Sequence, residues 1–202
     1  MHHFEITKIY SGSRASPRKK MKKLTRILFI IILIKGCAPS PSTLAKVDPF
    51  LLVTNADSLL MARPDDSELR AAIITAHINL AKTNNSVDHY KEVLKIEPRN
   101  ALANYNINML EGRAHHMSGH KNGQWDAIQS FAKAAAAIDT IGEPHYWLGQ
   151  AYEKKDEMDF ELPLESYDKA LLMFLPDDLR PKIASARAAL IKRKKTYEDF
   201  WK

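Results

Sequence analysis

The sequence predicts an all-α protein built from antiparallel helix hairpins. From Pro49 onward, apolar residues recur at helical spacing, and no segment keeps the alternation of a strand. Short polar turns interrupt this pattern, and helices joined by short turns pack as antiparallel neighbours. Two of the turns carry Pro64 and Pro98, which lie 34 residues apart. A period of this length predicts that the hairpin itself is repeated.

Each predicted helix is bounded by a polar or proline-containing turn, at residues 63–66, 83–85, 97–100, 140–142 and 175–178. The segment 50–62 resembles the second helix of an incomplete first repeat. The last helix, 179–200, is rich in Lys and Arg and is expected to form the polar-faced cap that a repeat array needs. The predicted helices are 50–62, 67–82, 87–96, 100–115, 124–138, 144–155, 162–174 and 179–200.

Two motifs carry a resemblance to the tetratricopeptide repeat (TPR) family. Leu148-Gly149-x-x-Tyr152 resembles the first helix of that repeat, although His145 stands where its tryptophan is expected. Ala127-x-x-x-Phe131-x-x-Ala134 resembles the second helix. The resemblance implies an all-α, TPR-like solenoid of antiparallel hairpins with a C-terminal capping helix.

Three repeats align in phase, at about 67–98, 101–139 and 142–176 within a domain that spans 49–202. The alignment requires an insertion of about seven residues within 114–123 and one of about two near 159–162. The aligned core positions are Ile73, Ile107 and Leu148 in the first helix, Tyr90, Phe131 and Tyr167 in the second, and Val93, Ala134 and Ala170 three residues later.

The charge of the chain is concentrated at its N-terminus. The formal net charge is +6, but residues 1–37 hold nine of the 30 Lys and Arg residues and one acidic residue. These residues carry a net +8, and the other 165 carry −2. Nucleic acid is therefore not an expected partner of the body, although the isoelectric point is near 9.3.

The N-terminus has the pattern of a bacterial lipoprotein signal peptide over 1–36. A positive block at 18–23 precedes the apolar run 27–34, which is too short for the ~20 residues that span a bilayer. Gly36-Cys37 resembles the lipobox in which the cysteine is acylated, with Lys35 as a departure from the usual small residue. The stretch that begins at Met21 is a complete signal peptide by itself. In one interpretation, residues 1–20 therefore come from an upstream start codon and are not translated. In another, 27–34 is a buried strand and Cys37 a core cysteine.

The resemblance implies a lipid anchor at Cys37, followed by an extended tether through residue 48 because Pro39 and Pro41 interrupt any periodicity. Ala38 is not the aspartate associated with inner-membrane retention in such lipoproteins. The expected location is therefore the bacterial outer membrane, facing the periplasm.

The body shows no catalytic constellation: Gly-rich phosphate loops, G-x-S-x-G, H-E-x-x-H and C-x-x-C motifs are missing from the sequence. We expect neither an enzyme nor a cofactor. His115, His116 and His120 lie in the insertion within 114–123, and imidazoles at this spacing suit zinc, copper or nickel. Gly119 weakens any helix there, so the favoured interpretation is an exposed polar loop without metal.

The resemblance to TPR arrays implies that the first helix of each unit lines a groove for a peptide or partner helix. The alternative is that several of these side chains only pack against the adjacent unit. The expected function is an adaptor for another envelope protein, and the alternative is a periplasmic metal- or small-ligand-binding component that uses the histidines. The outward positions are Thr75, Ile78 and Asn79, then Tyr105, Met109 and Arg113, then Tyr146, Gln150 and Lys154.

Overall fold

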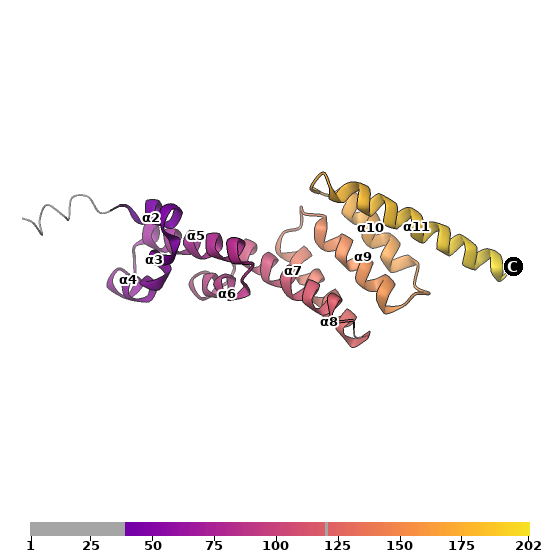
Figure 1. The fold of residues 1–202 in the computed structure, drawn as a ribbon, viewed down its shortest axis with the longest axis horizontal. Helices are drawn as coiled ribbons and strands as arrows, with labels where there is room; N and C mark the ends of the chain where they lie inside the picture. The colour runs from indigo at the N-terminus through magenta and orange to yellow at the C-terminus, as the bar shows by residue number, and fades with distance from the viewer. Residues whose placement is uncertain (1–38, 120) are drawn as a thin grey trace, which may run out of the picture. The chain divides into compact units, whose positions relative to one another are not determined.

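The structure is a computed structural model that describes residues 39–119 and 121–202. It confirms the predicted fold class, an all-α, TPR-like arrangement of successive antiparallel hairpins (Figure 1). In the described residues, the only β-type contact is an isolated bridge between Ile141 and Phe174. The helices are α2 (Pro41–Val47), α3 (Pro49–Thr54), α4 (Ala56–Ala62), α5 (Ser67–Asn84), α6 (Val87–Ile96), α7 (Ala101–Met117), α8 (Lys121–Ala137), α9 (Glu143–Lys155), α10 (Glu161–Leu172) and α11 (Leu179–Phe200).

The predicted tether is wrong over most of its length. Residues 41–47 form helix α2, which packs against α3 and α5 and belongs to the same compact unit as the rest of the body. Ala45 is buried, and its carbonyl accepts a hydrogen bond of 3.1 Å from the Asn79 side chain on α5. Pro41 occupies the first helical position, where a proline is tolerated because its missing N–H needs no partner.

The predicted helix 50–62 is two helices, α3 and α4, which meet at Asn55. Asp48 caps α3 by accepting a hydrogen bond of 3.0 Å from the Leu51 backbone N–H. Leu52 and Ala56 are buried with Leu69 of α5, so both short helices turn an apolar side toward the first hairpin.

The α5–α6 hairpin has the boundaries that the turn residues predict. Asp66 caps α5 through a hydrogen bond of 2.8 Å from Leu69 N–H. Asn85 ends the helix in the left-handed region, with φ of 51°, which asparagine tolerates better than most residues. The aligned core residues Ile73, Tyr90 and Val93 are all buried.

The second unit accommodates its extra residues in longer helices. We expected an insertion over 114–123, but α7 continues to Met117 and α8 begins at Lys121. Both helices have 17 residues, against 13 in α9 and 12 in α10. The predicted polar loop is therefore wrong for His115 and His116, which are helical.

Glycine contacts show where the predicted alignment shifts. A Cβ on Gly112 would lie 2.6 Å from Phe131, and a Cβ on Gly149 would lie 2.7 Å from Cδ1 of Tyr167. Gly112 and Gly149 thus occupy equivalent places against the second-helix aromatics. Ile107 precedes its glycine by five residues and Leu148 precedes its glycine by one, so this aligned pair is one helical turn out of register.

The last three helices, α9, α10 and α11, pack side by side in chain order (Figure 1). Ile183 and Leu190 of α11 are buried against α10 with Tyr167 and Ala170. The turns before α9 and α11 are joined by Gly142 N–H, which donates to the Phe174 carbonyl at 2.8 Å. Of the helices in the described part of the chain, none combines the length and apolarity needed to cross a membrane.

Candidate interaction surface

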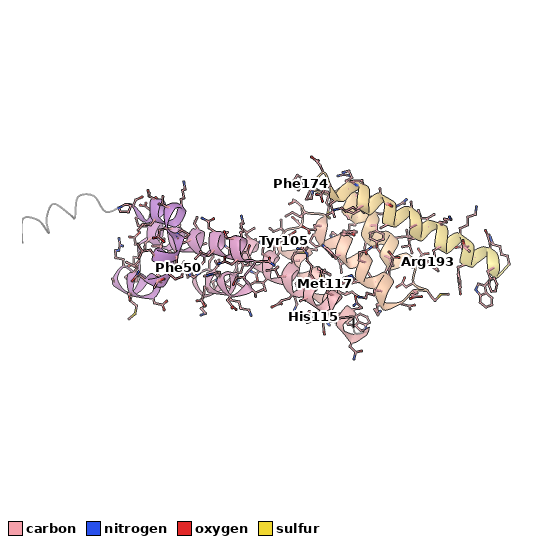
Figure 2. All side chains as sticks on the ribbon, viewed as in Figure 1. Phe50, Tyr105, His115, Met117, Phe174 and Arg193 are labelled. Atoms are coloured by element: carbon pink, nitrogen blue, oxygen red, sulfur yellow. The ribbon has the colours of Figure 1, made fainter. Side chains whose placement is uncertain are left out.

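Two of the predicted groove residues are buried inside the repeat array. Tyr105 is 8% exposed and Met109 is 3% exposed, and both pack with Phe131 and Leu148 at the junction of α7, α8 and α9. Their predicted outward placement is wrong, and the alternative, packing against the adjacent unit, describes them. Figure 2 shows Tyr105 among the helices of this region.

Arg113 takes part in the same junction through Glu143, the first residue of α9. Glu143 forms an ion pair with Arg113 and accepts hydrogen bonds from Tyr105 Oη at 3.3 Å and Trp147 Nε1 at 3.4 Å. The Arg113 guanidinium also lies 5.5 Å from the centre of the Trp147 ring. Burial raises the pKa of Tyr105, and the Glu143 carboxylate raises it further. These side chains join the second unit to the third.

The third-unit groove residues are partly committed to contacts within the array. Gln150 donates to the hydroxyl of Tyr167, and Tyr146 lies 6.2 Å from that ring, centroid to centroid. Lys154 is exposed, but its ammonium donates to the His116 carbonyl at 2.8 Å. The six groove candidates of the second and third units therefore leave a smaller free surface than their sequence pattern predicts.

The histidines in the second unit have structural partners. His116 lies 2.8 Å through Nδ1 from the Gln124 side-chain oxygen and packs edge-on against Trp147. Burial lowers the pKa of His116. His115 lies half-buried in the last turn of α7, whereas His120 lies outside the described residues. Within residues 39–119 and 121–202, no three side chains of His, Cys, Asp or Glu cluster as a metal-binding group.

A cavity of about 510 Å³ opens between α8, α9 and α10. His145 lines it where the TPR pattern expects tryptophan, and Ala132, Ala135 and Ala136 form one wall. Burial lowers the pKa of His145, and the positive charge of Lys169 lowers it further. The smaller side chains leave space that a tryptophan would fill.

The C-terminal half of α11 carries an apolar surface with exposed aromatic rings. A hollow of about 530 Å³ is lined by residues of this helix alone. Next to it, Phe200 is 78% exposed and Trp201 is 70% exposed, with ring centres 5.3 Å apart. We call this surface the α11 face and define it by Ala189, Lys192, Arg193, Thr196, Tyr197 and Phe200.

The α11 face is continuous with the side of α11 that packs on the array, because the Tyr197 ring lies 5.7 Å from the Phe160 ring and Arg193 lies over the same ring. Arg187 and Lys194 pair with Asp168 and Glu161 of α10, and Arg193 pairs with Glu153 of α9 at 3.1 Å. These ion pairs and the buried Ile183 and Leu190 hold one side of α11 on the array. Figure 2 shows Arg193 far along the helix. Helix α11 thus caps the array as predicted, and its last two turns also present the exposed rings of Tyr197 and Phe200.

The α11 face is basic where it is not apolar. In the part of the chain that the structure describes, Lys192 of the face and Lys195, which lies outside it on the same helix, have no acidic side chain within ion-pair distance. Glu198 and Asp199 lie in the same turns but do not line the hollow. An apolar hollow beside uncompensated lysines suits a ligand that carries both apolar and acidic groups.

Sequence reasoning missed three features of these surfaces. Glu143 follows a glycine at the start of a helix, and this position predicts a carboxylate that stabilises the helix end. It does not predict which side chains the carboxylate binds. Gln124 is almost fully buried, and nothing in its sequence neighbours marks it. The aromatic residues at the end of α11 could have been found in the sequence, because Tyr197, Phe200 and Trp201 follow the basic run 192–195. Cys37 lies outside the described residues.

The helices and the α11 face define an all-α, TPR-like protein with an open surface on its last helix. No protein-family model matches the chain, and no curated protein matches it. Solved structures are similar to it, including the following three. A protein described as "MamA RS-1 ArsTM double mutant" is 20% identical with a TM-score of 0.43, over 88% of this chain and 86% of that one.

Two further structures are described as "Crystal structure of MamA" and "Crystal structure of MamA protein". They are 15% and 16% identical, with TM-scores of 0.36 and 0.39. The first covers 73% of this chain and 89% of its own, and the second covers 77% and 88%. The fold assignment rests on the helices of the chain itself.

Proposed function

We propose that this chain is an interaction scaffold that binds an acidic, amphipathic helix of another protein on the α11 face. The observation that carries the proposal is the exposed aromatic end of α11 beside Lys192, on a helix whose other side is fixed to the array. A repeat array buries its core between neighbouring helices, so an uncovered apolar side of the last helix is the place where one more helix can pack.

The chemistry of the face defines the partner. Burying apolar surface is worth ~25 cal/mol per Å², so covering two exposed aromatic rings favours association strongly. Aromatic residues and arginine are the side chains most enriched at the centres of protein interfaces. Lys192 and Lys195 would then meet carboxylates on the polar edge of the partner helix, which sets its orientation and speeds its association.

The alternative function, metal or small-ligand binding by His115, His116 and His120, has less support. His116 is already hydrogen-bonded to Gln124, and the ring of His115 lies on a different part of the α7 surface. The scaffold is therefore the function that the geometry favours.

The location of the scaffold is part of the proposal. The charge block, the apolar run and Gly36-Cys37 together suggest a chain that is exported, cleaved and acylated at Cys37. Two signals are needed for stable anchoring by acyl chains, and lipoprotein acylation supplies more than one chain. The partner would be another protein of the bacterial envelope, reached from the outer membrane on its periplasmic side.

Docking on the α11 face is tested by crosslinking the tagged full chain in intact cells and purifying it from membranes. We expect one stoichiometric partner, which Phe200→Ala and Lys192→Glu each reduce at least several-fold. Phe174→Ala is the matched control, because Phe174 is also an exposed phenylalanine, at 71%, but lies outside the face. Equal recovery in all three variants would contradict docking at this face.

Anchoring is tested separately with a labelled fatty acid. The intact chain should take up label and fractionate with membranes, and Cys37→Ala should lose both properties. Uptake of no label by the intact chain, or unchanged labelling of Cys37→Ala, would show that the anchor is wrong while leaving the docking surface in place.

A further inference from the structure

Two histidines of the first hairpin face each other across helices. His77 lies on α5 and His89 lies on α6, twelve residues later. Their Nδ1 atoms are 3.2 Å apart, and their ring centres are 5.4 Å apart with the planes inclined by 52°. Neither residue is part of the groove, the α11 face or the histidine group of the second unit.

The separation of the two nitrogens matches that of two ligands on one metal ion. Zinc lies ~2.0–2.1 Å from a histidine nitrogen and is held in tetrahedral geometry. Two such bonds to atoms 3.2 Å apart enclose an angle of ~100–105°, close to the tetrahedral value. A metal could therefore sit between the nitrogens with little movement of either ring.

Burial and nearby charges both act on the pair. His77 is only 6% exposed and His89 is half-buried. The negative charges of Glu92 and Asp57 act on the His77 ring and would favour a cation beside it. Lys95 opposes a cation but is paired with Glu92 at 2.6 Å, so these two charges largely offset each other and Asp57 is the remaining negative charge.

We propose that His77 and His89 are two imidazole ligands of a divalent metal ion, principally Zn²⁺. The bound ion would link α5 to α6. No third His, Cys, Asp or Glu completes a cluster with them in the described residues, so water fills the other coordination positions. Imidazole ligands select zinc, copper and nickel over magnesium and calcium. The proposal does not depend on the partner or on the α11 face.

Binding of the metal would stabilise the first hairpin. The two nitrogens come together only when α5 and α6 pack, so the metal binds the folded chain and not the unfolded one. At a free zinc concentration a hundred times the dissociation constant, this linkage predicts a rise in Tm of about 5–10 °C.

The test is a zinc titration of the full chain after removal of metals with a chelator, followed by calorimetry and thermal unfolding. His89→Gln should bind one zinc fewer than the wild type and should lose the rise in Tm. His115→Gln is the control, because it removes a half-buried histidine of α7 that is not in the pair. This variant should keep both the zinc and the rise.

Two further measurements separate metal binding from folding. Circular dichroism without zinc should show that His89→Gln is as helical as the wild type. In NMR spectra, zinc should shift the ring resonances of both His77 and His89. Equal zinc stoichiometry and equal Tm shifts in wild type and His89→Gln, or ring resonances that do not move, would show that the pair is only hydrogen-bonded and would overturn the proposal.

Discussion

At the scale of single residues, close helix packing depends on pairs of one small and one large side chain. Gly112 lies against Phe131 and Gly149 lies against Tyr167, so the second and third hairpins are closed by the same pair of residue types. The sequence motifs predicted these aromatics as core residues, and all three, including Tyr90 of the first unit, are buried.

Gly149→Ala should destabilise the protein, because the added Cβ would lie 2.7 Å from Cδ1 of the fully buried Tyr167. Overpacking costs ~1–3 kcal/mol, and the better helix propensity of alanine offsets ~1 kcal/mol of this. Urea unfolding should show a net loss of up to about 2 kcal/mol. The double variant with Tyr167→Leu should show strong coupling between the two changes. Additive effects would contradict a direct contact.

The buried histidines make stability depend on pH. Burial lowers the pKa of His145 below its ordinary value of 6.5, so the unfolded chain binds the proton more tightly than the folded chain. The contribution of His145 is therefore fully present above pH 6.5 and is lost as the pH falls toward the folded-state pKa.

We expect Tm to fall between pH 7.5 and pH 5.5, and we expect a smaller fall in His145→Gln, which cannot take up the proton. His77 and His116, whose pKa values burial also lowers, should keep part of the dependence in that variant. The measurement is a series of thermal unfolding curves across this range. Identical pH dependence in the variant and the wild type would mean that His145 does not titrate in this way.

At the scale of helices, the boundaries followed the turn residues wherever a proline or a capping side chain marked them. Pro64, Asn85 and Pro98 delimit α5 and α6 as predicted, within about two residues. The sequence could not predict α2, because its two prolines and lack of periodicity indicate an extended segment. The helix forms because Ala45 is small enough to be buried against α5.

The extra residues of the second unit show a related limit. A length difference between repeats gives the number of inserted residues but not whether they extend a helix or form a loop. The side-chain amide of buried Gln124 contacts His116 twice: its oxygen lies beside the ring nitrogen Nδ1, and its nitrogen donates to the backbone carbonyl. These contacts connect the start of α8 to the end of α7 and keep both helices long. Gly119, with φ of 76°, provides the turn between them.

Two neighbouring residues on α11 test how the last helix is held. Leu190→Ala should lower the free energy of unfolding by about 2–5 kcal/mol, because Leu190 is buried against α10 and its loss leaves a cavity. Ile191→Ala is the matched control, since Ile191 is exposed, and it should cost less than about 1 kcal/mol. Urea unfolding of both variants measures the difference. Similar losses would contradict the orientation of α11 described above.

At the scale of the whole molecule, the fold class could be predicted from periodicity and three repeated motifs, whereas the interaction surface could not. Sequence patterns place residues on a helix side, but they do not show which side the next helix covers. Tyr105 and Met109 are covered by α9, whereas Phe200 on α11 is 78% exposed. Contacts between units thus decide which predicted surface residues remain available.

The most direct test of the scaffold is site-specific photocrosslinking in cells. A photoreactive amino acid is placed at Thr196, within the α11 face, or at Thr75, an exposed position on the predicted first-helix groove. We predict a single adduct with another protein from Thr196, lost when Lys192→Glu is added, and none from Thr75. An adduct from Thr75 with none from Thr196 would contradict docking on the α11 face.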